Sequence, residues 1–245
     1  MLVLDGGNSQ LKWGYWQTGA WQATGRLPLA ALSPAALAQA WREVPSAARI
    51  VGVTVAGAPV TAAVIAWCEQ HGRPAPVFFS ATAVAGGVRN AYAEPARLGA
   101  DRWAALLAGH HHYPGALCIA DVGTALTLDV LAADGQHHGG QIVPGPALLR
   151  ASLYQATRGI PDEGESGLTP FGRDTRSAVT GGAWYATAAV IERAHAEAQQ
   201  LLRAPVQLLL TGGAAQTVLP LLRIPALHDE HLVLRGVLRL AEEML

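Results

Sequence analysis

The chain has 245 residues, of which 51% are hydrophobic and 14% charged, and its formal net charge is −1. This composition supports a sizeable buried core and excludes intrinsic disorder. The balanced charge provides no basic footprint for a polyanion, so we expect no nucleic-acid partner.

The distribution of apolar and basic residues also argues against a membrane protein and a secreted protein. No apolar run approaches the roughly 20 residues of a membrane-spanning helix, and the first residues lack the basic segment of a secretory signal. Cys68 and Cys118 both lie inside apolar runs, as small buried residues do in a reducing compartment. We therefore expect a cytoplasmic protein with no membrane partner.

The first half of the chain begins with three short strands joined by glycine-containing turns and continues with alternating helices and strands. Ser33 followed by Pro34 predicts the start of a helix that carries Leu37 and Trp41 on its apolar face. The predicted strands are 1–5, 11–17, 20–25, 49–57 and 76–80, and the other predicted helices are 59–72 and 100–113.

The second half repeats this order. The predicted strands are 117–121, 125–133, 137–145 and 205–213, the helices are 146–159, 181–203, 214–223 and 230–244, and 161–176 is a polar loop. We expect an α/β protein of two domains, 1–114 and 115–245. The order is that of a ribonuclease H-like unit, and by analogy with actin-like ATPases two such units face each other across a cleft.

An aspartate and a glycine-bearing turn occur at the same place in each half: DGGNS at 5–9 and DVGT at 121–124. A tight turn between antiparallel strands presents backbone N–H groups to anionic oxygens, and glycine lets a phosphate approach. Ser9 and Thr124 each add a hydroxyl donor. Asp5 and Asp121 suit a cation that bridges to phosphate, such as Mg²⁺. One such turn alone would be an ordinary hairpin, whereas two at equivalent positions predict a nucleotide site.

With these motifs placed, the chain resembles the type III pantothenate kinases of the acetate and sugar kinase/Hsp70/actin superfamily. The resemblance spans most of the length and rests on the strings DGGNS (5–9), NAYAEPARLGADRWAAL (90–106), IADVGTALTLDV (119–130), GGQIVPGPALLRASL (139–153), TRSAVTGGA (175–183) and LLLTGG (208–213). The LGADR segment is the most specific of them. One departure is Ser9, where the family more often has threonine.

The resemblance implies phosphorylation of pantothenate by ATP, the first step of coenzyme A biosynthesis, in a homodimer that uses Mg²⁺ and a monovalent cation (K⁺ or NH₄⁺). Asp101 is then the catalytic carboxylate, and Asp121 lies near the monovalent cation. The implied pantothenate-binding residues are Tyr92, Gly99, Ala100, Arg102 and Thr180. The implied ATP-binding residues are Asp5 (through water-bound Mg²⁺), Gly6, Gly7, Asn8, Ser9, Gln10, Leu11, Lys12, Thr124, Gly212 and Gly213.

The residues themselves leave alternatives open. Asp101 could simply cap the helix that follows it, since aspartate is a favoured N-cap residue, and Lys12 could be an ordinary exposed strand lysine. Two other functions also remain: a kinase for another small hydroxyl substrate, and a non-catalytic transcriptional accessory protein on the same scaffold. The retained Asp5, Asp101, Asp121 and Thr124 favour catalysis.

Overall fold

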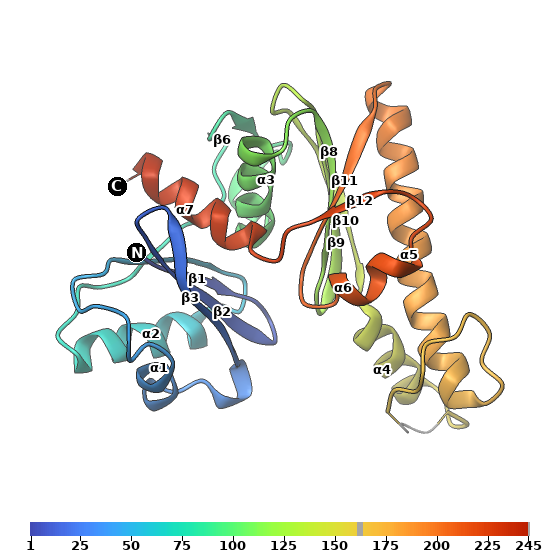
Figure 1. Ribbon diagram of the computed structural model, residues 1–245, viewed down its shortest axis with the longest axis horizontal. Coiled ribbons are helices and arrows are strands. Elements are labelled where there is room, and N and C mark those ends of the chain that lie inside the picture. Colours follow the sequence, from blue (N-terminus) through green and yellow to red (C-terminus); the bar gives the residue numbers. More distant parts are fainter. Residues whose placement is uncertain (161–163, 245) are drawn as a thin grey trace. The chain divides into compact units, whose positions relative to one another are not determined.

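A computed structural model describes residues 1–160 and 164–244 (Figure 1). The chain divides into two compact units. The first contains Met1–Tyr113 and the C-terminal segment from His231, and the second is Pro114–Glu230. Of the predicted 161–176 loop, residues 161–163 lie outside the described residues.

The first unit is built on a five-stranded sheet of order β3-β2-β1-β4-β5. Its strands are β1 (Leu2–Gly6), β2 (Gln10–Gln17), β3 (Ala20–Pro28), β4 (Ile50–Thr54) and β5 (Val77–Phe78). β1 pairs antiparallel with β2 and parallel with β4. The strands β1 to β3 therefore form an antiparallel meander, and β4 and β5 extend the sheet in parallel with β1. The first two strands and their connecting turn agree with the predicted meander.

Helices cover both faces of this sheet (Figure 1). Its helices are α1 (Pro34–Ala40), α2 (Ala58–Gln70), α3 (Ala100–His112) and α7 (Leu232–Met244). Trp41, the C-cap residue of α1, and Trp67 of α2 pack with Leu2 and Leu4 in one core cluster, so these two helices share a face. Ser33 caps α1 as predicted, its Oγ accepting a hydrogen bond from the Ala36 N–H at 3.2 Å.

Short elements that the sequence analysis did not predict connect β5 to α3. They are the hairpin β6 (Val84–Ala85) and β7 (Val88–Arg89) and the 3₁₀ turn η2 (Pro95–Arg97); another 3₁₀ turn, η1 (Leu29–Ala31), follows β3. The hairpin turns at Gly86 and Gly87, which both have positive φ. Its strands are only two residues long, too short for an alternating pattern to be recognised.

The second unit repeats the arrangement, with sheet order β10-β9-β8-β11-β12. Its strands are β8 (Ala116–Val122), β9 (Ala125–Leu131), β10 (His137–Pro144), β11 (Val206–Thr211) and β12 (Ala226–His228). Its helices are α4 (Pro146–Ala156), α5 (Thr175–Leu202) and α6 (Ala215–Val218), and α6 continues into the 3₁₀ turn η3 (Leu219–Leu221). The predicted helix 214–223 is therefore shorter and broken, and β12 was not predicted.

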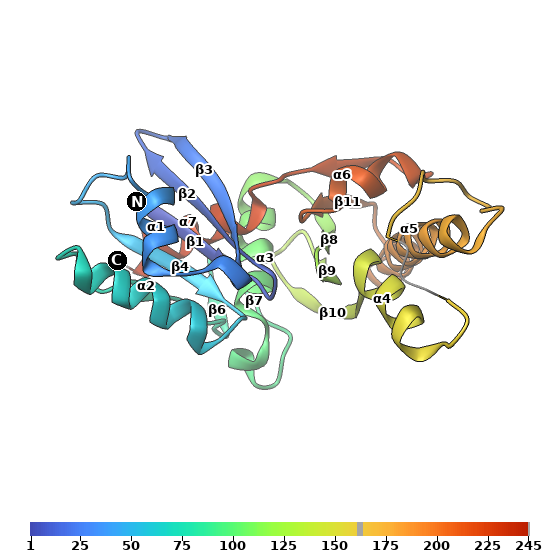
Figure 2. The same cartoon turned by 90° about the horizontal axis from the view of Figure 1, so that it is seen from below.

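The long helix α5 packs along one face of the second sheet and lies beside α4 in both views (Figure 2). It begins at Thr175 and not at 181, because Asp174 and Ser177 form a capping box: the Ser177 N–H donates to Asp174 Oδ1 at 2.8 Å. Gly181 and Gly182, with which the predicted helix began, lie inside the observed one. Within the described part of the chain, no helix combines the length and apolarity of a membrane span.

The compact units differ from the expected domains 1–114 and 115–245 in the place of the C-terminal helix. The chain divides after Tyr113, and α7 belongs to the first unit, where it packs on α3. Gly236 of α7 lies so close to Ala104 of α3 that a β-carbon at 236 would come within 1.8 Å of the Ala104 carbonyl oxygen. The apolar face of α7 was evident in the sequence, but it did not indicate which sheet the helix would cover.

Candidate active site

The first aspartate–glycine turn is held from beneath by the end of β4. The Gly6 carbonyl accepts hydrogen bonds from the Val55 N–H at 2.9 Å, the Ala56 N–H at 3.3 Å and the Thr54 hydroxyl at 3.1 Å. The Gly7 N–H donates to the Gln10 carbonyl at 3.0 Å and closes the turn. The tip residues Asn8 and Ser9 are exposed. The turn is thus rigidly supported while its tip stays open to a ligand.

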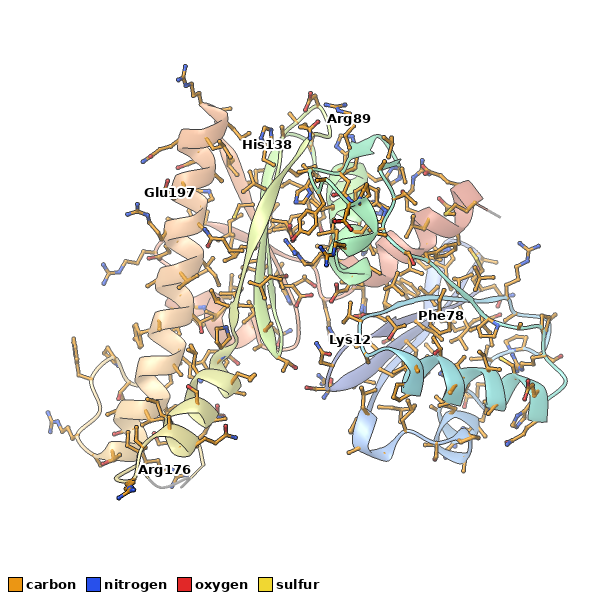
Figure 3. All side chains as sticks on the ribbon, turned by 180° about the vertical axis from the view of Figure 1, so that it is seen from behind. Lys12, Phe78, Arg89, His138, Arg176 and Glu197 are labelled. Carbon is orange, nitrogen blue, oxygen red and sulfur yellow. The ribbon has the colours of Figure 1, made fainter. Side chains whose placement is uncertain are left out.

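Asp5 and Lys12 face each other across the first two strands. They are register partners in the β1–β2 pair, and Lys12 Nζ lies 3.8 Å from Asp5 Oδ2. The Asp5 side chain is only 7% exposed and that of Lys12, labelled in Figure 3, is 31% exposed. Lys12 is therefore paired with the buried carboxylate, while its partial exposure leaves the ammonium group accessible. Leu11 is fully buried, so its side chain belongs to the core.

The second turn, one residue shorter, makes corresponding hydrogen bonds in its own unit. The Val122 carbonyl accepts from the Ala214 N–H at 2.9 Å, the Gly123 N–H donates to the Ala125 carbonyl at 3.0 Å, and the Thr124 carbonyl accepts from Gly145 at 3.0 Å. In the first unit, the Ser9 carbonyl likewise accepts from Leu29, at 2.9 Å. Thr124 is exposed at the tip, as Ser9 is.

The sheet registers confirm that the turns are structural equivalents. Asp5 lies opposite Val53 of the parallel strand β4, and Asp121 lies opposite Thr211 of the parallel strand β11. Gly212, the residue after Thr211, packs directly against Asp121: a β-carbon there would come within 2.3 Å of Oδ1. The second aspartate, its turn and Gly212 therefore form one continuous surface in the second unit, and Gly213 is exposed beside it.

The segment around Asp101 begins α3 in the first unit. Gly99 is the N-cap residue and makes no side-chain cap, so the alternative of Asp101 as the N-cap residue is not what the structure shows. Asp101 follows Ala100 in the first turn, and its Oδ1 accepts the Arg102 N–H at 2.7 Å. A carboxylate near the N-terminus of a helix is stabilised by the helix dipole. The side chain is partly exposed, as contact with a substrate requires.

Gly99 makes this carboxylate conformation possible. A β-carbon at residue 99 would lie 2.6 Å from Asp101 Oδ1, so any larger residue would displace the carboxylate. The same β-carbon would lie 3.7 Å from Val55 Cγ1, and the Val55 N–H is bonded to the Gly6 carbonyl. Val55 thus joins the first turn to the start of α3, which places both at one end of β4.

Buried Arg102 is paired with the partly exposed Tyr92. Arg102 Nη1 donates to the Tyr92 hydroxyl at 2.9 Å, and the guanidinium carbon lies 5.7 Å from the centre of the tyrosine ring. Arg102 is only 6% exposed. Burial of a guanidinium is costly unless its hydrogen bonds are satisfied, so Tyr92 fixes the orientation of the cation. The structure brings these two predicted residues together.

Thr180 lies in the second unit, inside α5. It is 1% exposed, and its Oγ1 accepts the Ser166 N–H at 3.3 Å from the loop that precedes α5. A β-carbon at Gly181 would come within 2.3 Å of the Thr169 carbonyl oxygen, so this loop packs closely on the helix. Figure 3 shows Arg176 near this end of α5, where its Nη2 donates to the Glu165 carbonyl. Thr180 therefore lies beneath its own loop.

The sequence analysis did not assign a role to Thr54 or Asn90. Thr54 closes the space beneath Gly6, where a β-carbon would lie 2.6 Å from its Oγ1. Asn90 is the first residue of the NAYAEP string, which was a signal that could have drawn attention to it. The side chain of Asn90 makes three hydrogen bonds to the segment that carries Tyr92.

The model of the type III pantothenate kinase family matches residues 1–197. Type III pantothenate kinases of Aromatoleum aromaticum and Nitrosococcus oceani are 40% and 37% identical to the chain. The alignments cover 99% of this chain in both cases, and 98% and 94% of the respective relatives. Near-complete coverage of both partners shows that the likeness is not limited to the nucleotide turns.

Solved structures show the same fold at low sequence identity. A protein of Campylobacter jejuni described as a Baf family transcriptional activator has a TM-score of 0.61 at 20% identity, covering 99% of this chain and 98% of that one. MreB 5 of Spiroplasma citri, solved with AMPPNP bound, has a TM-score of 0.51 at 10% identity, covering 99% and 96%. These likenesses support the predicted actin-like ATPase fold and nothing more specific. The full-length relatives and the family model together show that the chain belongs to the type III pantothenate kinase family.

Proposed function

We propose that the chain transfers the terminal phosphoryl group of ATP to the primary hydroxyl of pantothenate, which yields 4′-phosphopantothenate and begins coenzyme A biosynthesis. The observation that carries the proposal is the placement of Asp101 and Arg102 at the same end of β4 as the Gly6 turn, in a chain of this family. An acceptor-binding segment beside a phosphate turn is what phosphoryl transfer requires.

The glycine-bearing turns are proposed to bind ATP through backbone N–H groups and small polar side chains. In the first unit these are Gly6, Gly7, Asn8, Ser9 and Gln10, with Lys12 able to approach phosphate from the neighbouring strand. In the second unit they are Thr124, with Gly212 and Gly213 for the adenosine. The matched hydrogen-bonding schemes support a common role, and that both turns hold one nucleotide stays a prediction.

The residues at the strand ends fit magnesium delivered with ATP. Among the described residues no group of three or more His, Cys, Asp or Glu side chains could form a full cage. Mg²⁺ commonly keeps water and takes only one or two protein carboxylates together with phosphate oxygens, which suits Asp5. Bound magnesium would neutralise charge on the phosphate oxygens. Asp5 itself lies at the base of the turn and is held there by β1 and Lys12.

A monovalent cation is proposed near Asp121. Its Oδ1 lies against Gly212, where the missing side chain leaves the carboxylate close to the backbone. A hard oxygen ligand of this kind suits K⁺, and the same charge suits NH₄⁺.

Asp101 is proposed to orient the pantothenate hydroxyl and accept its proton. In a loose phosphoryl-transfer transition state, bond breaking leads and proton removal lags, so orientation matters more than basicity. Arg102, fixed by Tyr92, is proposed to bind the pantothenate carboxylate, with Gly99 and Ala100 shaping the wall. A role for Thr180 stays a prediction: its hydroxyl accepts from Ser166 and keeps its own hydrogen to donate.

A homodimer is proposed from the family and from the surface of the second unit. Exposed apolar side chains gather on α4, α5 and the loop between them; they are Leu148, Leu153, Leu168, Phe171 and Tyr185. Size-exclusion chromatography with light scattering tests this, and a monomer at micromolar concentration would contradict it. A cytoplasmic location is proposed because both cysteines are free and buried.

The function is tested by coupled ADP release with purified protein, ATP, Mg²⁺ and pantothenate, with and without K⁺ or NH₄⁺. Mass spectrometry should detect 4′-phosphopantothenate, and the rate should depend on pantothenate. A panel of other small alcohols serves as the control. Faster turnover of another acceptor would indicate a different kinase, and no turnover of any acceptor would favour a non-catalytic role.

A further inference from the structure

We propose that Asn90 is a positioning residue for the pantothenate end of the site: it sets the place of Tyr92 and, through Tyr92, the orientation of Arg102. This inference rests on the proposed function and assigns a role to a residue outside the predicted site. It concerns only the first unit, where all three residues lie.

The Asn90 side chain makes hydrogen bonds to three separate points of the connecting segment. Its Nδ2 donates to the Thr82 carbonyl at 3.1 Å and to the Pro95 carbonyl at 3.2 Å, and its Oδ1 accepts the Tyr92 N–H at 3.0 Å. Only one orientation of the amide satisfies two acceptors and one donor. The identity of the residue is therefore matched to its surroundings, and neither aspartate nor leucine could replace it fully.

These bonds substitute for regular structure. β7 ends at Arg89 and η2 begins at Pro95, and residues 90–94 belong to no helix or strand. The Asn90 N–H also donates to the Ala83 carbonyl at 2.9 Å, which extends the hairpin by one bond. The Asn90 side chain thus links the segment that carries Tyr92 to Thr82, just before the hairpin, on one side and to Pro95 of η2 on the other.

The position of Tyr92 then reaches Arg102. Its hydroxyl accepts the Arg102 Nη1–H at 2.9 Å, and its ring lies 5.7 Å from the guanidinium carbon. Because Arg102 is 6% exposed, a displaced Tyr92 would leave a buried cation with one hydrogen bond fewer. The guanidinium would then reorient, and the acceptor end of the site would lose its alignment with Asp101, the residue immediately before Arg102.

Two substitutions separate the parts of this arrangement. Asn90→Ala removes all three side-chain bonds. Asn90→Asp keeps an oxygen for the Tyr92 N–H but loses both donors and places a carboxylate against two carbonyl oxygens. If Asn90 acts through Tyr92, Asn90→Ala should impair pantothenate use more than Asn90→Asp, although Asn90→Asp is expected to be at least as destabilising.

The matched control is Ser33→Ala, which removes one local hydrogen bond at the start of α1. α1 belongs to the same unit but packs with α2 and away from α3. This variant should lower the melting temperature without a change in KM for either substrate, which separates general destabilisation from a positioning role.

The experiment measures kcat and KM for pantothenate and ATP in the wild type, Asn90→Ala, Asn90→Asp, Tyr92→Phe and the Asn90→Ala/Tyr92→Phe double variant. We expect Asn90→Ala to lower kcat/KM for pantothenate by ~10–10²-fold, as small misplacements in active sites do, with KM for ATP within about twofold. In the Tyr92→Phe background the loss should be at least about threefold smaller, because the contact it acts through is already weakened.

The outcomes distinguish this inference from the proposed function. A wild-type protein that does not phosphorylate pantothenate would overturn both. With an active wild type, the inference fails if Asn90→Ala raises both KM values equally, if its effect multiplies fully with that of Tyr92→Phe, or if it lowers only the melting temperature. Should Asn90→Ala not fold, Asn90→Asp carries the test: loss of its two donors still loosens the segment on both sides of Tyr92, so a modest fall in kcat/KM for pantothenate, with KM for ATP unchanged, is expected. An unchanged kcat/KM for pantothenate in this variant would contradict the proposal.

Discussion

Gly212 lies directly against Asp121. A β-carbon on Gly212 would come within 2.3 Å of Asp121 Oδ1 and 2.6 Å of the Val122 backbone nitrogen. The φ angle of Gly212 is +95°, in the region that glycine adopts without steric cost. The carboxylate of the second turn therefore rests on a surface that only glycine can provide.

Gly212→Ala should lower both stability and activity. The unfavourable φ alone costs roughly 1–2 kcal/mol, which corresponds to a fall of about 2–8 °C in the melting temperature of a chain of this size. The added carbon would also displace Asp121. The control is Gly213→Ala: no atom lies within 4 Å of a β-carbon there, so its melting temperature should stay close to that of the wild type. Equal melting temperatures for the two variants would contradict the packing described.

Asp101→Ala and Thr124→Ala should each lose most of the turnover and keep the fold. Proton-accepting groups of the Asp101 kind contribute ~10²–10⁴-fold, and a single preorganised donor of the Thr124 kind contributes ~10²–10³-fold. Both side chains are at least partly exposed, so circular dichroism should be unchanged. Thr61→Ala is the control, since the Thr61 hydroxyl only donates to the Ala58 carbonyl at 3.0 Å within α2. Full activity in either of the first two variants would remove that residue from the site.

Gly236→Ala should push α7 away from α3. A β-carbon at Gly236 would lie 1.8 Å from the Ala104 carbonyl oxygen, so α7 must move away from α3, which carries Asp101 and Arg102. We expect a lower melting temperature and a reduced kcat/KM for pantothenate. Gly182→Ala is the matched control: it lies in α5 with no atom near its β-carbon position, and it should gain roughly 0.5–1 kcal/mol from better helix propensity. Thermal denaturation checks both variants. A melting temperature that moves in the same direction in Gly236→Ala and Gly182→Ala would contradict the close packing of α7 on α3.

Features that depend on local chemistry could be predicted from the sequence. Ser33 followed by Pro34 marks a helix start because a hydroxyl cap and a fixed φ act within a few residues, and the structure has the cap there. The repeated aspartate–glycine turns were predicted for the same reason, and their backbone hydrogen bonds correspond, although the second turn is one residue shorter. The pairing of Asp5 with Lys12 is a further local feature, because it follows from the register of β1 and β2.

Features that depend on distant contacts could not be predicted in this way. α7 is amphipathic, but its choice of the first unit depends on the close approach of Gly236 to Ala104, and neither residue signals the other. The burial of Thr180 depends on a loop that folds back from 164–172, a contact that leaves no periodic pattern. The hairpin that Asn90 closes has strands of two residues each, which is below the length at which alternation is informative.

Cys118 provides a pH-dependent prediction. Burial, reinforced by the nearby negative charge of Asp129, raises the pKa of the Cys118 thiol from 9.0 to about 12. The unfolded chain ionises this thiol near pH 9, whereas the folded chain holds it neutral, so its contribution to stability is complete below pH 9 and is lost as the pH rises towards 12.

The midpoint of urea unfolding should therefore fall between pH 8 and pH 10.5 by more in the wild type than in Cys118→Ala. The cavity left by the substitution lowers stability equally at both pH values and cancels from this comparison. Cys68 is retained in both proteins, and its own raised thiol pKa cancels as well. Iodoacetamide at pH 8 should modify Cys118 only after unfolding, because the native thiol is fully buried. Rapid modification of the native protein, or an equal fall in both midpoints, would show that the thiol reaches solvent in the folded state.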